Sequence, residues 1–335
     1  MVNLYMGYEK VTEKKYAIGV DLGGSWIRAV LSDEYGNFII KLKERVNVNN
    51  ENSISNQIIR LTRTLCSESN ANFTDLKGVG IASTGPLDLR KGALVNPTNL
   101  PFKFIPLTKP ISSKLKSPVH LLNDCTAGVI GEKQFGAGKG LKNLVYITLS
   151  TGIGGGAIVD DHLLLGKDGN AVEIGHFTID YTGKLKCGCG KRGHWEAYCS
   201  GRNIPNFVRM TLKEIGKDEV SNSLLFKTLE GDFSKLTSEH LFNVAKSGDN
   251  LSLELVEEIG RLNAIGFANI INAYDPSLIT VGGSIALKNR GLVIPPIKRF
   301  IENYTRNRIP KIILTPLTED VCLYGAIAAV FTFEN

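Results

Sequence analysis

The 335-residue chain has few cysteines, no block of positive charge and no long apolar segment, and each of these absences excludes a class of protein. Six cysteines are too few for a disulfide scaffold in a chain of this length. No apolar run approaches the roughly 20 residues that cross a bilayer. The first fifteen residues also lack the apolar stretch of a secretion signal. We therefore predict a cytoplasmic protein that does not bind membranes.

Positive charge is present, but it is scattered along the chain. The sequence has 39 Lys and Arg residues against 33 Asp and Glu, a formal net charge of +6. Nucleic-acid-binding proteins more often cluster their cations on one element. With 43% hydrophobic and 21% charged residues, the composition is that of a folded protein. We predict a folded protein that does not bind nucleic acid and has at most a mild preference for anionic ligands.

The length favours two domains, and the first part of the chain reads as a βββαβ unit. Strands are predicted over residues 15–20, 26–31 and 38–42, and the polar turns between them favour an antiparallel meander. An amphipathic helix over 53–67 and a strand over 76–82 follow. A further strand over 119–123 leads into a helix that begins at Asp124 and continues to Phe135.

A second unit begins like the first. A strand over 143–149 runs into the glycine-rich segment 150–156, as the first strand runs into segment 21–28, and another strand is predicted over 157–159. Residues 203–274 are mostly helical by their apolar period. The remaining elements predicted are strands over 277–281 and 312–315 and an apolar helix over 320–331. The recurrence of the opening pattern suggests an internal duplication.

The two glycine-rich segments are candidate phosphate-binding turns. Glycines let backbone N–H groups approach phosphate oxygens closely, and the first segment adds Ser25 and an arginine beside a carboxylate. The first segment is not a Walker loop, because Gly-Lys-Ser/Thr is missing, and it is no Rossmann fingerprint, because it leads to a strand. A plain hairpin turn is the alternative for this segment alone. Together the two segments favour a nucleotide lying between two domains.

Asp124 stands where a strand ends and a helix begins. Open α/β sheets build their ligand clefts at the carboxyl ends of strands, so Asp124 is a candidate general base. The alternative is that its carboxylate only caps the helix.

The most specific signal is a segment rich in cysteine and histidine. His176, Cys187, Cys189 and His194 fall within nineteen residues, with glycines that allow a tight loop. Two thiolates and two imidazoles match the tetrahedral preference of Zn²⁺ in closed, structural sites. Cys199 is an alternative fourth ligand, ranked lower because a helix is expected to begin near residue 196. The other three cysteines are predicted to be core residues.

These motifs resemble the ROK family of sugar kinases and sugar-responsive repressors, within the superfamily of sugar kinases, heat-shock chaperones and actin. Segments 21–28, 122–128, 150–156 and 173–196 match in order, and the resemblance spans about residues 16–330. It implies an α/β, two-domain actin-like ATPase fold of the ribonuclease H type, with a ligand cleft between the domains. The expected domains are a small one over 16–122 with the C-terminal helix 322–335, and a large one over 123–321 with the zinc module at 173–196.

The resemblance also implies roles for individual residues. Asp124 is expected to take the proton from a sugar 6-hydroxyl. The expected sugar contacts are Asn99, Asn123, Asp124, Glu173, His176 and Glu196. The expected ATP contacts are Asp21, Gly23, Gly24, Ser25, Arg28, Thr151, Gly152, Gly154, Gly282 and Gly283. Structural zinc is expected on His176, Cys187, Cys189 and His194, where most members have a third cysteine in place of His194.

The implied activity is phosphorylation of the 6-hydroxyl of a hexose by ATP with Mg²⁺. Glucose is expected because segment 96–102 resembles a loop of glucokinase-like members; the alternative is an N-acetylglucosamine or N-acetylmannosamine kinase. A sugar-sensing repressor is disfavoured, since about fifteen residues before the first strand are too few for a helix-turn-helix domain. We expect a homodimer or homotetramer; the sequence decides neither the preferred sugar nor the oligomeric state.

Overall fold

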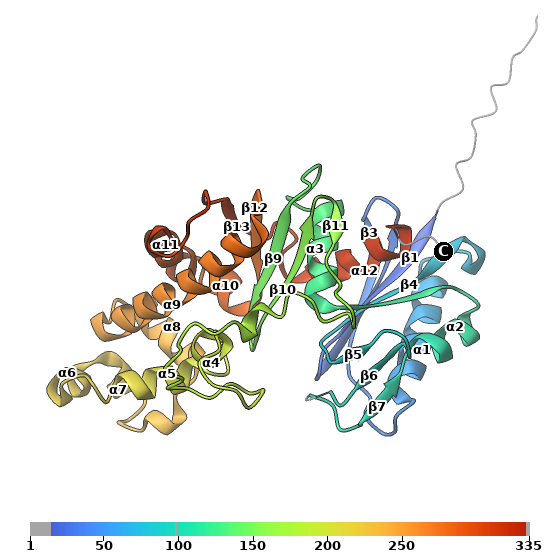
Figure 1. Cartoon of the computed structure of the whole chain (residues 1–335). Coiled ribbons are helices and arrows are strands. Elements are labelled where there is room, and N and C mark those ends of the chain that lie inside the picture. Colours follow the sequence, from blue (N-terminus) through green and yellow to red (C-terminus); the bar gives the residue numbers. More distant parts are fainter. Residues whose placement is uncertain (1–14, 98, 333–335) are drawn as a thin grey trace, which may run out of the picture.

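Two five-stranded sheets organise the protein, whose computed structural model describes residues 15–97 and 99–332 (Figure 1). Three neighbouring strands of each sheet form an antiparallel meander. Two further strands continue each sheet in parallel from the first strand of its meander. The two sheets therefore share one topology, as the predicted duplication requires.

The first sheet contains the strands predicted before residue 124. In sheet order they are β3 (Phe38–Arg45), β2 (Trp26–Asp33), β1 (Tyr16–Leu22), β4 (Leu76–Ser83) and β8 (Val119–Asn123). Helix α1 (Ser53–Glu68) contacts β2, and α2 (Thr108–Leu115) contacts β8; a short 3₁₀ turn η1 (Phe73–Asp75) precedes β4. Ile54, Ile58 and Leu61 of α1 are fully buried, which confirms the predicted amphipathic helix.

A small antiparallel sheet lies between β4 and β8 in the sequence, and the sequence analysis did not predict it. Its strands are β5 (Leu87–Asp88), β6 (Ala93–Val95) and β7 (Phe104–Pro106). Strands of two or three residues are too short for alternation of apolar and polar residues to stand out.

The second sheet repeats the order of the first. Its strands are β11 (His162–Leu163), β10 (Ile153–Val159), β9 (Leu144–Leu149), β12 (Leu278–Gly282) and β13 (Lys311–Leu314). Between β11 and the predicted helical region lie η2 (Ile174–His176) and α4 (Glu196–Cys199). The helical region predicted over residues 203–274 comprises α5 (Ile204–Thr211), α6 (Lys217–Asn222), α7 (Leu224–Thr228), η3 (Phe233–Lys235), α8 (Ser238–Lys246) and α9 (Asn250–Tyr274). After β12 come α10 (Ser284–Lys288), α11 (Arg290–Phe300) and η4 (Ile301–Asn303).

Two helices cross between the sheets, and each packs on the sheet that it does not follow in sequence (Figure 1). Helix α3 (Asp124–Gln134) follows the last strand of the first sheet but contacts β9 and β10. Helix α12 (Val321–Thr332) follows the second sheet through η5 (Thr318–Asp320) but contacts β1 and β4. They cross closely, since a Cβ on Gly325 would lie 1.7 Å from the carbonyl oxygen of Ala127. The crossing therefore ties the two sheets together.

The second glycine-rich turn is shorter than predicted. Strand β10 begins at Ile153, so Gly154 and Gly156 belong to a strand and only residues 150–152 form the turn. A Cβ on Gly154 would lie 2.7 Å from the Cys125 sulfur, and one on Gly156 would lie 2.3 Å from the Cys125 carbonyl oxygen. These glycines let α3 approach the sheet closely. Because they carry no side chains, the first part of β10 shows no pattern of apolar residues, and the sequence did not predict it as a strand.

The closing apolar helix is present as α12, and residues 333–335 of the predicted span lie outside the described residues. Among the described residues, no helix combines the length and apolar character that crossing a membrane requires.

Candidate functional site

The predicted motifs gather at the carboxyl edges of the parallel strands. In the first sheet, Leu22, Ser83 and Asn123 are aligned across β1, β4 and β8, so the first glycine turn and Asp124 follow strands that end at one edge. In the second sheet, Thr148 of β9 is aligned with Gly282 of β12, so turn 150–152 and Gly283 share an edge. Such edges are where α/β proteins bind their ligands.

Asp124 is not the cap of helix α3, because Asn123 holds that position. The Asn123 Oδ1 atom accepts hydrogen bonds from the backbone N–H groups of Cys125 at 2.9 Å and Thr126 at 3.3 Å. The half-buried Asp124 accepts a bond from the Cys125 N–H at 2.8 Å. Burial raises the pKa of Asp124, and the negative charges of Asp21 and Glu173 raise it further. A carboxylate with a raised pKa is better suited to accept a proton.

Arg28 is occupied by protein partners at the first glycine turn. Its Nε donates to Asp21 Oδ2 at 2.9 Å, its Nη1 to Asp320 Oδ1 at 2.9 Å and its Nη2 to the Glu319 carbonyl oxygen at 2.7 Å. Asp320 lies just before α12, far from the turn in sequence. A phosphate contact by Arg28, which the sequence predicts, therefore has to compete with these three partners.

The loop that carries Asn99 packs on the first glycine turn. A Cβ on Gly24 would lie 2.7 Å from the Asn99 Cβ, so glycine is required for this approach. The turn itself is closed by a bond from the Gly23 N–H to the Trp26 carbonyl at 3.0 Å, and Ser25 accepts from the Val46 N–H at 3.1 Å. The predicted sugar loop and the predicted phosphate turn are thus in contact.

The second turn is held by the segment around Glu196. Glu196 Oε2 accepts a hydrogen bond from the Ile153 N–H at 2.9 Å. Gly201 donates to the Ser150 carbonyl at 2.7 Å and Arg202 donates to the Thr151 carbonyl at 3.2 Å. A side chain on Gly152 would collide with Glu196, since its Cβ would lie 2.8 Å from Oε2.

Two hydroxyl groups join the second and third glycine segments. The Oγ atoms of Ser150 and Ser284 lie 3.1 Å apart. Gly283 has φ +87°, and its Cβ would lie 2.4 Å from the Leu149 carbonyl oxygen, so only glycine fits there. The sequence did not predict that Ser150 and Ser284 meet, because their contact depends on the pairing of β9 with β12.

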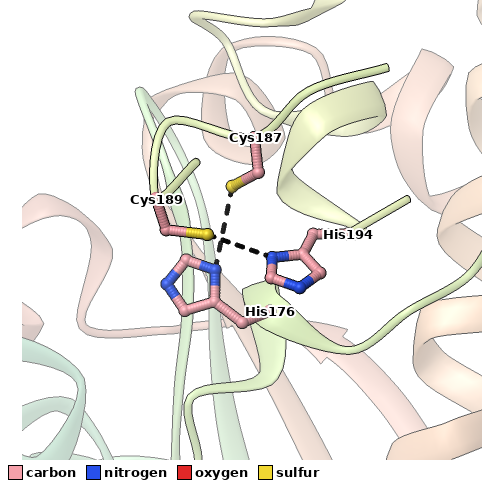
Figure 2. A group of neighbouring side chains, drawn as sticks. All are labelled: His176, Cys187, Cys189 and His194. Carbon is pink, nitrogen blue, oxygen red and sulfur yellow. Dashed lines mark hydrogen bonds between the residues drawn. The ribbon is translucent and has the colours of Figure 1, made fainter. Parts of the chain in front are cut away.

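The four predicted metal ligands converge on one point (Figure 2). Their ligand atoms all lie within 4.8 Å of one another. Cys187 Sγ is 3.8 Å from His176 Nδ1, and Cys189 Sγ is 3.3 Å from His194 Nδ1. Tetrahedral zinc with bonds of about 2.0–2.3 Å holds its ligand atoms roughly 3.3–3.8 Å apart. The donor set and its spacing therefore fit Zn²⁺.

Cys199 lies outside this cluster. Its thiol is buried on α4 and contacts the Ile259 carbonyl oxygen of α9 at 3.7 Å. Burial strongly raises the pKa of the Cys199 thiol, as expected for a core cysteine. Between the two candidates for the fourth ligand, the structure places His194 in the cluster.

The cluster is linked to the predicted sugar contacts. His176 turns Nδ1 toward Cys187, while its Nε2 lies 3.8 Å from Glu173 Oε2. The Cys187 thiol is 3.7 Å from Glu196 Oε1, and burial raises the pKa of this thiol to about 12. A bound cation favours the thiolate instead, which is the form that ligates zinc.

Side chains behind the cluster fix its loops. The buried Trp195 donates from Nε1 to Asn263 Oδ1 at 2.9 Å, which attaches the segment to α9. Asp180 accepts a hydrogen bond from the Thr182 N–H at 2.9 Å and one from the Tyr198 hydroxyl. Burial alone would raise the pKa of Asp180, but the bonds from Thr182 and Tyr198 outweigh it and lower the pKa to about 2.

Comparison with known proteins agrees with these motifs. Residues 17–331 match the sequence model of the ROK family. The chain belongs to the ROK family. It is 36% identical over 314 residues to a glucokinase from Pyrobaculum calidifontis, covering 94% of each protein. It is 30% identical over 270 residues to the xylose repressor of Bacillus subtilis, covering 81% of this chain and 64% of that protein.

A solved ROK structure confirms the predicted fold. The ROK family glucokinase from Streptomyces griseus, in complex with glucose and AMPPNP, superposes with a TM-score of 0.73 at 28% identity. The match covers 93% of this chain and 98% of that one. The ROK protein described here therefore has the α/β actin-like ATPase fold that the motifs indicate.

In this ROK protein the structure brings together some predicted residues and separates others. The metal cluster assembles, Glu196 reaches the second turn, and the charges of Asp21 and Glu173 act on Asp124. Gly154 lies inside a strand against α3. Asp320, which binds Arg28, was not predicted, because nothing in the local sequence links residues so far apart.

Proposed function

We propose that this ROK protein is an ATP-dependent kinase that phosphorylates the 6-hydroxyl of a hexose, with glucose as its preferred sugar. The observation that carries the proposal is Asp124, a carboxylate whose pKa is raised at the carboxyl edge of the first sheet while Asn123 caps the helix. The similarity to the P. calidifontis glucokinase supports the choice of sugar.

Asp124 acts as the general base and accepts the proton of the sugar hydroxyl as that oxygen attacks the terminal phosphate. Asn99, Asn123, Glu173, His176 and Glu196 hold the other sugar hydroxyls. Phosphoryl transfer depends mainly on positioning and on neutralising the phosphate charge. When bound with ATP, Mg²⁺ supplies part of that neutralisation.

The glycine segments hold the nucleotide. The backbone N–H groups of residues 24, 25, 151 and 152 face the phosphates, because the N–H groups of Gly23 and Ser150 close their own turns. Gly282 and Gly283 line the opposite end of the nucleotide. Asn99 packs against Gly24 and Glu196 packs against Gly152, and each approach requires glycine at that position. These contacts support the proposed role, because the candidate sugar ligands lie directly beside the candidate phosphate turns.

The ligand cleft lies between a small domain, residues 16–122 with the C-terminal helix from residue 322, and a large domain, residues 123–321. The crossing helices support this division, since α3 packs on β9 and β10 and α12 packs on β1 and β4. Closure of the domains excludes water and prevents wasteful hydrolysis of ATP.

A structural zinc ion is held by His176, Cys187, Cys189 and His194. Zinc supplies a fixed anchor that orients these side chains. Its role in the reaction is indirect: with Nδ1 directed to the cluster, the His176 Nε2 atom is directed toward Glu173 and the sugar. Support comes from the convergence of the four ligand atoms within 4.8 Å.

The decisive experiment is an ADP-release assay with Mg-ATP across glucose, mannose, fructose, glucosamine and the two N-acetyl sugars. We expect glucose to give the highest kcat/KM. A pocket without room or a partner for the acetamido group rejects N-acetyl sugars through steric clash and unpaired polar groups. A higher kcat/KM for either N-acetyl sugar would replace the glucokinase proposal with its alternative. Failure to phosphorylate any of these sugars would contradict the kinase proposal itself.

A further inference from the structure

Four charged side chains form a continuous chain of ion pairs beside the first glycine turn. Asp21 pairs with Arg28, Arg28 pairs with Asp320 at 2.9 Å, and Asp320 pairs with Lys41 at 2.6 Å. We call these four residues the ion-pair chain. The side chains are 17–32% exposed, so water screens these pairs less than it screens a surface pair.

The ion-pair chain draws on four separate elements. Asp21 is in β1 and lies opposite Arg28 of β2 in the antiparallel register, and Lys41 is in β3. Asp320 is the last residue of η5, immediately before α12 crosses to the first sheet. The guanidinium of Arg28 also donates to the Glu319 carbonyl oxygen at 2.7 Å. The start of α12 is thereby attached to the strand that carries the first glycine turn.

The contacts on Arg28 are directional. Both Nε and Nη2 donate to the same oxygen of Asp21, and Nη1 donates to Asp320. A guanidinium held on both sides cannot rotate without breaking several charge-assisted bonds. Arg28 therefore determines where the Asp21 carboxylate points, and Asp320 with Lys41 determines where Arg28 lies.

We propose that Arg28 is a positioning residue for Asp21 beside the catalytic base, and that Asp320, itself held by Lys41, anchors Arg28. This assigns Arg28 a role other than phosphate binding and adds Asp320 and Lys41 to the residues that the reaction requires. The inference rests on the proposed function because its kinetic effect is read through Asp124.

Asp21 and Asp124 lie at the same sheet edge, since Asp21 is aligned with Ala82 of β4 and Ala82 with Leu122 of β8, two residues before Asp124. The thiol of Cys322, two residues after Asp320, donates to the Asp124 carbonyl oxygen at 3.5 Å.

The effect of the ion-pair chain can be measured through the pKa of Asp124, because charged groups nearby shift that pKa. Asp21 and Glu173 are the negative groups that raise the pKa of Asp124. The nearby thiols of Cys125 and Cys322 have pKa values raised by burial, so they are neutral at ordinary pH. The phenol of Tyr146 is neutral for the same reason. The positive charge of Arg28 partly neutralises the negative charge of Asp21. When Arg28 is removed, the full charge of Asp21 acts on Asp124 and raises the pKa of Asp124 further.

The test is the pH dependence of kcat in the full-length protein and three variants. Because the base works only when deprotonated, a higher pKa moves the acid limb of the profile to higher pH. We expect Arg28→Met to move that limb up by about 1 pH unit and to lower kcat about tenfold. Asp320→Asn should lower kcat by a smaller factor and should not move the acid limb to higher pH, because it loosens Arg28 but removes a negative charge and leaves Arg28 paired with Asp21. Arg28→Lys should return the acid limb toward the wild-type position but not restore kcat, because an ammonium lacks the paired donors.

The matched control is Arg299→Met, which breaks an exposed arginine–glutamate pair between α11 and α9. It should leave kcat and its pH profile unchanged. If Arg28→Met raises the KM for ATP while kcat and the acid limb stay at wild-type values, Arg28 is a phosphate ligand and the inference is wrong.

A second measurement does not need activity. Carbon-13 NMR of protein labelled at the aspartate carboxyl carbons follows the titration of Asp124, with Asp124→Asn identifying its signal. Arg28→Met should raise the observed pKa of Asp124, and an unchanged titration would overturn the inference. If the wild type phosphorylates no sugar but the titration shifts as expected, the proposed function fails and the ion-pair chain stands.

Discussion

The two glycine turns occupy equivalent positions in two sheets of the same topology, yet the protein holds them in different ways. Charged side chains surround the first turn, where Arg28 connects Asp21 to Asp320. Backbone hydrogen bonds close both turns, but among the described residues no chain of ion pairs lies at the second turn: Glu196 accepts a bond from the Ile153 N–H, and Gly201 and Arg202 donate to the carbonyl oxygens of the turn. The repeated topology thus preserves where a glycine turn lies but not how it is fixed.

The difference also determines what each turn is connected to. The first turn is linked through Asp320 to helix α12, which crosses between the sheets. The second is linked through Glu196 to the segment that carries the metal cluster. The first turn should therefore respond to changes at the crossing of the helices, and the second to changes at the metal cluster and the proposed sugar site.

The largest effect is expected at Asp124, which belongs to neither turn. Asp124→Asn should lower kcat by about 10²–10⁴-fold because the base is lost. Binding of glucose and AMPPNP, measured by calorimetry, should persist, since the carboxylate acts mainly in the transition state. Asn123→Ala is the contrasting variant: loss of the cap should cost about 1 kcal/mol of stability. Near-normal kcat in Asp124→Asn would refute the role of Asp124 as base.

Removal of the metal should affect the second turn and spare the first. We expect purified protein to hold about one zinc ion per chain by elemental analysis. Cys189→Ser and His194→Ala should lose the metal and raise the KM for sugar. Cys199→Ser should retain the metal, because this thiol lies against α9. Loss of zinc from Cys199→Ser with retention in His194→Ala would show that the cluster geometry is misassigned.

An alanine substitution in each turn tests the difference between the first and second glycine turns. In Gly152→Ala the new Cβ meets Glu196 Oε2 at 2.8 Å, whereas in Gly24→Ala it meets Asn99 at 2.7 Å. We expect Gly152→Ala to weaken binding of both AMPPNP and glucose, because Glu196 is shared by the turn and the sugar site. Gly140→Ala is the control, since its Cβ would meet nothing within 4 Å and only its φ of +76° adds strain. Unchanged affinity for both ligands in Gly152→Ala would contradict the proposed link, through Glu196, between the second turn and the sugar site.

The smallest effect concerns acid stability near the metal segment. Asp180 has a folded-state pKa of about 2, below the ordinary 3.8. Its contribution, at most about 2 kcal/mol, is present above pH 4 and is lost as the pH falls through about 2. Asp180→Asn should therefore lower the Tm at pH 7 and make little difference near pH 2. An equal loss of Tm at both pH values would show that the hydrogen bonds, rather than the charge, carry the stability.

Periodicity predicted most of the larger elements correctly. Helix α1 carries apolar residues at the helical period and strand β1 is a short, continuous apolar run, so local sequence is sufficient to reveal both. The small sheet β5–β7 was not predicted because its strands are too short to show a period. Glycines hid the first part of β10, since the side chains that mark a strand are absent where α3 packs closest.

The sequence by itself indicated a cysteine–histidine metal cluster and the positions of the two turns, because their residues are close neighbours along the chain and their chemistry is carried by residue type. Only the tertiary structure decided that Arg28 binds Asp320, 292 residues away, and that His194 rather than Cys199 joins the cluster. Contacts of this kind follow from the packing of α12 and α9, and the sequence around either partner carries no local pattern that specifies the other.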